Sequence, residues 1–323
     1  MGGLPFPWAD GFSGVALAGV QFIVPRFFVM PQGDVQPMTV SDVSLFRLAA
    51  SFVAGFAVVA LVTTLADLFG EGPAGFLGGL PSTGPIGLLS IGITQSTEAA
   101  VKATTLFPLG FAVTFAFLLF YAFPARLRFW ARMPLALGLW LLSAVAVSIW
   151  SPDDFALSVS VSAAVSLVVL YLRWRIRTER PRRLTISTGY LRVAMRGVLG
   201  GSVVAMAVIL SAVAGPLVGG VFAAAPAVWS SSLYVTNRAQ GVQFSRSLTW
   251  PFMQTGILTV IPYAIAARYF FSVAGVWWGT LLAYLCMSPF AYVAWRLTNE
   301  RKNSADSPGP VTNERRLRKP VEL

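Results

Sequence analysis

Stretches of about twenty apolar residues follow one another along almost the whole chain, separated by short segments that carry most of the charge. An α-helix needs roughly 20 apolar residues to cross the hydrocarbon core of a bilayer. The 323 residues are 56% hydrophobic and only 11% charged, which is too little charge to cover the surface of a soluble protein. The sequence therefore predicts an all-α, polytopic integral membrane protein.

About 10 apolar segments are long enough to be transmembrane helices. Pro25 and Arg26 interrupt the first segment, so that segment either spans the membrane or lies at its surface. We divide the chain into a first membrane unit (1–150), a second (151–298) and a disordered, charged tail (299–323). The ten segments are residues 11–30, 43–66, 75–96, 101–123, 133–150, 155–174, 193–214, 217–236, 248–270 and 273–297.

The positions of the basic residues predict the orientation of these segments. If the first segment leads out of the cytoplasm, about 20 of the 24 lysines and arginines fall inside and about 4 outside. The arginine-rich link 173–183 then lies inside, and the acidic loop 31–42 lies outside. We expect a multi-pass protein of the cell membrane with both termini in the cytoplasm. The net charge of +11 reflects these orientation signals and does not indicate nucleic-acid binding.

The two halves of the chain resemble each other when the sequence is shifted by about 145 residues. Each half holds five apolar segments, and because five is odd, the second half begins on the opposite side of the membrane. The sequence therefore predicts two inverted five-helix repeats, an arrangement typical of secondary transporters. The residues that the shift matches are Arg47 with Arg192, Gly55 with Gly200, Pro81 with Pro226, and Gln95 with Gln240.

Glycine and proline interrupt two equivalent apolar segments, at residues 72–87 and 215–232. Proline removes a backbone donor and clashes with the preceding turn, so a continuous helix is disfavoured there. Freed backbone groups are tolerated at membrane depth only where protein or a wet cavity satisfies them. Corresponding interruptions in two halves indicate a solute site between them. Close helix packing through small residues explains the same pattern without a site.

We expect the site to combine hydroxyl groups, helix N-termini and basic side chains. A half-helix starting near Ser82 and Thr83 would direct its first amide groups towards an anion or a dipole. Arg47 and Arg192 begin equivalent helices, where interfacial snorkelling is the competing interpretation. No carboxylate is clearly placed at mid-membrane, which argues against a proton relay, and the excess of basic over acidic residues at the ends of the spans favours a neutral or anionic solute. The candidate binding residues are Gly78, Gly79, Pro81, Ser82, Thr83, Pro226, Trp229, Ser230, Arg47 and Arg192.

The segment Gly78-Gly-Leu-Pro-Ser-Thr-Gly-Pro-Ile-Gly-Leu-Leu-Ser90, followed by Arg126-Leu-Arg-Phe-Trp130, resembles a family of short bacterial inner-membrane proteins of unknown function. Members of that family are built as a single four-helix unit. The similarity covers residues 70–150, with a weaker echo at 215–297. The resemblance implies a duplicated half-unit and no activity. The five-plus-five layout is similar to that of the drug/metabolite transporter superfamily in architecture alone.

These observations predict a secondary transporter that moves a small solute by alternating access between the repeats. Its expected partners are membrane lipids and that solute, and the sequence leaves oligomerisation open. We expect no cofactor, metal or enzymatic activity, because the chain has no histidine and a single cysteine, Cys286. Two alternatives stay open: a non-transporting scaffold or assembly protein, and a membrane enzyme that modifies lipid headgroups held by the inner arginines.

Overall fold

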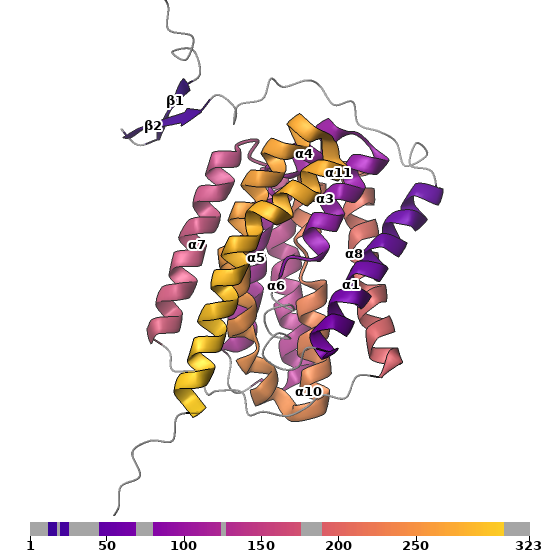
Figure 1. Ribbon diagram of the computed structural model, residues 1–323, viewed down its shortest axis with the longest axis vertical. Helices are drawn as coiled ribbons and strands as arrows, with labels where there is room; N and C mark the ends of the chain where they lie inside the picture. Colours follow the sequence, from indigo (N-terminus) through magenta and orange to yellow (C-terminus); the bar gives the residue numbers. More distant parts are fainter. Residues whose placement is uncertain are drawn as a thin grey trace, which may run out of the picture.

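A computed structural model describes residues 12–17, 20–25, 45–68, 80–123, 127–175 and 189–306. Most of the described chain is helical, and Figure 1 shows the helices as one bundle with long members on its outside. This confirms the all-α class. The helices are α1 (Leu45–Leu68), α3 (Thr83–Thr94), α4 (Thr97–Ala103), α5 (Phe107–Ala122), α6 (Phe129–Trp150), α7 (Phe155–Arg175), α8 (Tyr190–Ala214), α9 (Pro216–Ala223), α10 (Ala227–Ser247) and α11 (Thr249–Asp306).

Within the described residues, six helical stretches are long and apolar enough to cross a membrane. A seventh is present if α4 and α5, which meet at a bend of 43°, count as one span. The structure therefore fits a membrane-spanning protein, whereas the expected count of about ten spans is not confirmed. The helix α11 continues to Asp306, past the expected start of the tail at residue 299, and the rest of that tail lies outside the described residues.

The first expected span is not a helix where the structure describes it. Residues Phe12–Leu17 (β1) and Val20–Pro25 (β2) form an antiparallel hairpin in which Leu17 pairs with Val20. The sequence explains this outcome. The segment of β2 is rich in valine, isoleucine and phenylalanine, which favour strands, and ends in proline, whereas Gly14 in the segment of β1 disfavours a helix there. Apolar character alone did not distinguish these strands from a helix.

The outer surface of the bundle is apolar, and many of its buried groups are hydroxyls. Leu142 and Ile149 on α6 and Leu167 on α7 are exposed, as are the paired Trp277 and Trp278. A water-soluble protein does not expose so continuous an apolar surface. Serine and threonine hydroxyls are instead buried between the helices, where they can bond to backbone carbonyls. This distribution suits a protein surrounded by lipid.

The long helix α11 is a helical hairpin that turns at Gly275. Its apolar stretch Thr249–Leu297 would measure about 70 Å as a straight helix, more than twice the thickness of a bilayer core. Gly275 has φ 72° and ψ 174°, a conformation open to glycine almost alone. The ring centroids of Tyr263 and Tyr284 lie 5.4 Å apart, because the two limbs pack against each other. The hairpin supplies the ninth and tenth expected segments.

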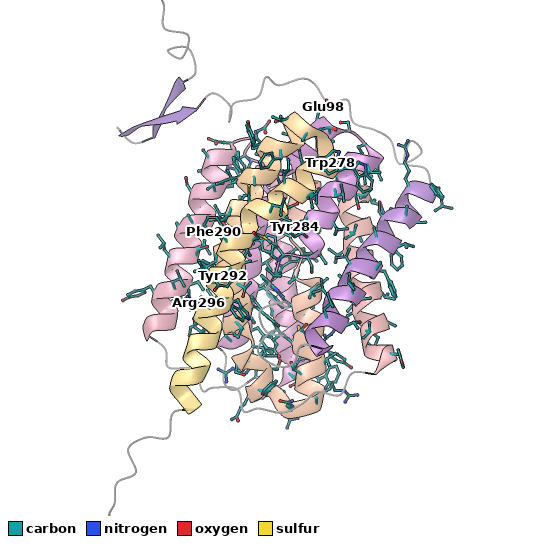
Figure 2. The ribbon with its side chains drawn as sticks, in the orientation of Figure 1. Glu98, Trp278, Tyr284, Phe290, Tyr292 and Arg296 are labelled. Atoms are coloured by element: carbon teal, nitrogen blue, oxygen red, sulfur yellow. The ribbon has the colours of Figure 1, made fainter. Side chains whose placement is uncertain are left out.

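The bundle has two ends, which we name the α4 end and the α10 end after the short elements found there (Figure 1). Figure 2 shows Glu98 and Trp278 at the α4 end, and Arg296 towards the other end on the second limb of α11. At the α4 end, the Lys102 ammonium lies 3.5 Å from an oxygen of Asp153. At the α10 end, the Arg246 guanidinium donates to the carbonyl of Ala122 at 2.6 Å.

Helices α1 and α8 pack closely through small residues. A Cβ atom added at Gly55 would lie 2.8 Å from Val204, and one added at Gly200 would meet Val59. Gly197 lies against Phe56 and Gly201 against Phe52 in the same way. Along this seam the residue number rises on α1 as it falls on α8, so the two helices are antiparallel. Close backbone approach through glycine is the usual way for helices to associate in lipid.

Candidate functional site

The helices α9 and α10 together form one broken span. The helix α9 ends at Ala223, α10 begins at Ala227, and Pro226 stands between them as the residue before the first helical turn of α10. Proline cannot donate a backbone hydrogen bond, so the chain is interrupted there. The carbonyls nearest the break are nevertheless paired: those of Val221, Phe222 and Ala225 accept from the amides of Ala224, Ala225 and Ala227, respectively.

The helix α3 begins at the same depth from the other half of the chain. Its N-cap is Ser82, whose own amide donates to the carbonyl of Leu80 at 2.8 Å, directly beside Pro81. From this point α3 leads towards the α4 end, while α10 leads towards the α10 end (Figure 1). Two helices thus start in the interior of the bundle and leave it in opposite directions.

A central recess lies where these two starts meet. Its volume is about 250 Å³ including the space at its mouth, and its interior has room for about one water molecule. Thr114 on its wall accepts from Trp140, the midpoint of α6, which places the recess near the middle of the bundle. The lining residues are Leu80, Pro81, Ser82, Thr83, Phe111, Thr114, Ala224, Ala225, Pro226, Val228 and Trp229.

Thr114 ties three elements together at the recess. Its hydroxyl donates to the carbonyl of Ala224 at 2.7 Å, and it also lies 3.0 Å from the carbonyl of Gly110 in its own helix. The indole nitrogen of Trp140 donates to the same hydroxyl at 3.0 Å. Thr114 is 1% exposed, so these bonds form away from bulk water. The break between α9 and α10 is therefore satisfied by α5, as a membrane interior requires.

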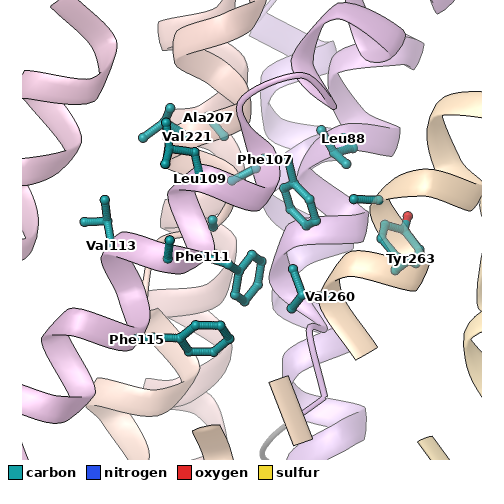
Figure 3. Close-up of a cluster of buried hydrophobic side chains, with 14 of the residues drawn as sticks. Leu88, Phe107, Leu109, Phe111, Val113, Phe115, Ala207, Val221, Val260 and Tyr263 are labelled. Carbon is teal, nitrogen blue, oxygen red and sulfur yellow. The ribbon is translucent and has the colours of Figure 1, made fainter. Parts of the chain in front are cut away.

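Two aromatic residues, Phe111 and Trp229, form part of the recess wall and are backed by further rings. Trp229 stacks on Phe115 and Phe252, with centroids 6.1 and 6.2 Å apart and interplanar angles of 19° and 7°. Phe111 meets Trp229 edge-on at 5.9 Å. Figure 3 shows Phe107, Phe111 and Phe115 directed to one side of α5, facing Val260 and Tyr263 of α11. Trp229 at the recess is therefore packed between rings of α5 and α11.

The recess contains two hydroxyl groups that the fold does not use. Ser82 is 6% exposed and Thr83 is 7% exposed, and both line the recess. The Ser82 side chain makes no capping bond to α3. Neither hydroxyl bonds to any residue within the described ranges. Neither oxygen is among the fully buried, unpaired side-chain atoms of the described residues, so both hydroxyls open into the recess, where they can bond to water or to a bound molecule.

The structure brings together five of the ten expected site residues: Pro81, Ser82, Thr83, Pro226 and Trp229. Arg47 lies elsewhere, where its guanidinium donates to the carbonyl of Thr94 at the end of α3, at 3.0 Å. Ser230 is one residue past the recess and bonds to the carbonyl of Ala227. Arg192 lies in the first turn of α8, and its side chain is outside the described part, as are Gly78 and Gly79.

Two functional candidates, Thr114 and Phe111, were missed by sequence reasoning. Both lie in an unbroken apolar helix, where a single threonine and one phenylalanine among several carry no local signal. The internal shift offered a clue, because Thr114 matches Thr259, a buried threonine that stands out in the ninth expected segment. In the described ranges, no group of three or more histidine, cysteine, aspartate or glutamate residues could hold a metal ion.

At each end of the bundle, an arginine side chain bonds one half of the chain to the other. At the α4 end, Arg268 of α11 donates to the carbonyl of Val101 at 3.3 Å and to the hydroxyl of Thr105 at 2.9 Å. At the α10 end, Arg246 reaches the carbonyl of Ala122, as described above. The shift of about 145 residues relates the two contacts. It carries position 268 to 123 and position 101 to 246, one residue away from the contact between Arg246 and Ala122. Each end therefore has its own arginine tie.

No family model matches this chain, and neither the curated proteins nor the solved structures include a match. The resemblance to short four-helix inner-membrane proteins stays a prediction.

Proposed function

We propose that the protein is a secondary transporter that moves a small neutral or anionic solute by alternating access between two inverted repeats. The observation that carries this proposal is the meeting of two helix starts, those of α3 and α10, one from each half, at a recess near mid-depth. Discontinuous helices that point their N-termini into the middle of the bundle are the usual construction of a transporter site. Transport would require the recess to open towards each end in turn.

The packing of α1 against α8 supports the inversion. Under the shift of about 145 residues, Gly55 corresponds to Gly200 and Val204 to Val59, so the contact of Gly55 with Val204 has its equivalent in the contact of Gly200 with Val59. Reciprocal contacts of this kind arise at a two-fold axis. Because α1 and α8 are antiparallel, such an axis runs perpendicular to the helices and hence in the membrane plane.

The helix bounds support the repeat along the rest of the chain. The shift carries α1 onto α8, and α3 onto the part of α10 before Gly241. It also carries α5 and α6 onto the two limbs of α11. We place the α10 end in the cytoplasm of a cell-membrane protein, because Arg128, Arg132 and Arg246 lie there. The position of the N-terminus depended on the first expected span and is not carried over.

Accessibility of the recess tests this proposal without knowledge of the solute. The chain would carry Cys286→Ser with Thr83→Cys, and a membrane-impermeant maleimide would be added to either side of oriented vesicles. We expect labelling from both sides, because the recess opens alternately. Leu88→Cys is the matched control, since Leu88 lies on α3, is fully buried and is not among the lining residues. A Thr83→Cys chain as unreactive as the control would contradict the proposal.

A non-transporting scaffold is the second candidate, favoured by the small size of the recess. Close packing through Gly55, Gly200 and the α9 glycines is also what a rigid scaffold would use. The two candidates differ in the same experiment, because a scaffold keeps Thr83 sealed from both sides whereas a transporter does not.

A further inference from the structure

The polar groups at the central recess are unequally used, because the carbonyls at the end of α9 are largely occupied whereas the donors at the two helix starts are not. The carbonyls of Val221, Phe222 and Ala225 accept backbone amides, and that of Ala224 accepts the Thr114 hydroxyl. The C-terminus of α9 therefore offers few open acceptors to a bound molecule. A cation or a pure hydrogen-bond donor would find little to bind there.

The open donors come from the starts of α3 and α10. The first amides of any helix have no acceptor within that helix. For α3 these include Thr83 and Gly84, and for α10 they include Val228, a residue of the recess wall. Each helix start carries a partial positive charge of about half an elementary charge. Two such starts from opposite directions together favour about one negative charge.

The hydroxyls of Ser82 and Thr83 point to the same ligand chemistry. Both side chains are more than nine-tenths buried, line the recess and bond to no described residue. A neutral hydroxyl can donate its hydrogen to an anion without changing its own protonation state. The recess wall carries no charged side chain among its lining residues, so nothing there would balance a second negative charge.

We propose that the central recess, once it opens beyond the room for about one water molecule that it has here, binds a small monovalent anion, a carboxylate of about the size of acetate, between the N-termini of α3 and α10. This inference names the solute class of the transporter proposed above and rests on that function. The anion accepts from the Ser82 and Thr83 hydroxyls and from the first amides of the two helices. The stacked rings of Trp229 and its neighbours enclose the apolar part of the solute.

Thermal unfolding of the purified full chain in detergent tests the binding directly. The probes are sodium acetate, its neutral counterpart acetamide, and sodium gluconate as a bulky anion at equal ionic strength. We expect acetate alone to raise Tm, by about 2 °C or more at ten times its Kd. The Ser82→Ala, Thr83→Val double variant should lose most of that rise. Equal Tm values in all three solutions would overturn the inference.

A charge placed in the recess provides a second, independent measurement. Ser82→Asp adds a carboxylate where the anion would bind, and Ser82→Asn is its neutral match in shape. We expect Ser82→Asp to unfold at or above the Tm of Ser82→Asn at neutral pH and to be insensitive to acetate. A Ser82→Asp chain that unfolds well below the Ser82→Asn chain would show that the recess rejects negative charge.

Failure of this inference is distinguishable from failure of the transport proposal. Binding in detergent needs no membrane and no gradient. A chain that binds acetate while Thr83→Cys stays sealed overturns transport alone. A chain whose Thr83→Cys is labelled from both sides, but whose Tm ignores acetate, overturns the anion site alone.

Discussion

Thr114 shows how much one hydroxyl can connect in this protein. It links α5 to the break before α10 through Ala224 and to the centre of α6 through Trp140. The recess therefore depends on a residue outside the glycine- and proline-rich segments that led to it.

Thr114→Val should destabilise the protein, because valine keeps the shape and removes both bonds. The Ala224 carbonyl and the Trp140 indole would be left unpaired. Interhelical hydrogen bonds in membranes contribute about 0.6–1.7 kcal/mol each, so we expect a loss of about 1–3 kcal/mol in unfolding free energy. Thr259→Val is the matched control, since its hydroxyl bonds only to the Thr255 carbonyl within its own helix. Denaturant unfolding in mixed micelles measures both, and equal losses would refute the assigned role of Thr114.

The residues lining the recess were predictable to the extent that local chemistry marks them. Pro81 and Pro226 interrupt apolar segments at equivalent places, a signal visible without a structure. Arg47 on α1 carried a comparable signal. Its side chain nevertheless reaches the end of α3, away from the recess, because a guanidinium can satisfy the open carbonyls of a helix C-terminus. Thr114 carried no local signal, only its match with Thr259 under the internal shift, because its partners come together only when the chain folds.

At the scale of elements, the seam between α1 and α8 depends on the absence of side chains. Gly55→Ala and Gly200→Ala should each destabilise the protein by about 1–3 kcal/mol, because the added methyl groups meet Val204 and Val59. Gly138→Ala, inside α6 with open space around it, is the control and should be neutral or slightly stabilising. Thermal unfolding in detergent measures all three. Adding Val59→Ala to Gly200→Ala should restore part of the loss, and no recovery would argue against this contact.

The hairpin of α11 makes a different demand on glycine. Gly275 has open space where a Cβ would be, so its requirement is conformational and not steric. Gly275→Ala should therefore cost about 1–3 kcal/mol through backbone strain alone. The same substitution at Gly138 tests helix propensity without strain. If Gly275→Ala unfolds at the wild-type Tm, the turn does not have the left-handed conformation described here.

Element boundaries also show where sequence reasoning stopped. The expected segments 43–66, 155–174 and 193–214 agree closely with α1, α7 and α8, since long apolar runs bounded by charge leave few alternatives. The first segment failed because valine, phenylalanine and isoleucine suit strands as well as membrane helices. The break between α4 and α5 lies inside the fourth segment. Pro108 in the first turn of α5 has no amide hydrogen to donate to the carbonyl of Thr104, so it marks a helix start that the expected continuous segment overlooked.

At the scale of the whole molecule, the proposed alternating access requires the two ends to close in turn. Arg268 and Arg246 are placed to do this, because each joins the two halves at one end through backbone carbonyls. Removing one tie should favour the conformation that is open at that end. A hydrogen bond from a charged group contributes about 1.5–3 kcal/mol in proteins generally and less in membranes, so a shift of about fivefold in population is expected.

Labelling of Thr83→Cys measures that shift. Arg268→Met should raise the ratio of labelling from the α4 side to labelling from the α10 side, because the contacts to Val101 and Thr105 are lost. Arg246→Met should lower the same ratio, because its tie lies at the opposite end. Arg128→Met is the control, since Arg128 is exposed at the α10 end and its side chain holds no such contact in the described structure. Opposite shifts follow only if the two ends are coupled through the recess. Shifts in the same direction would mean that both substitutions simply loosen the bundle, and the rocking mechanism would have to be abandoned.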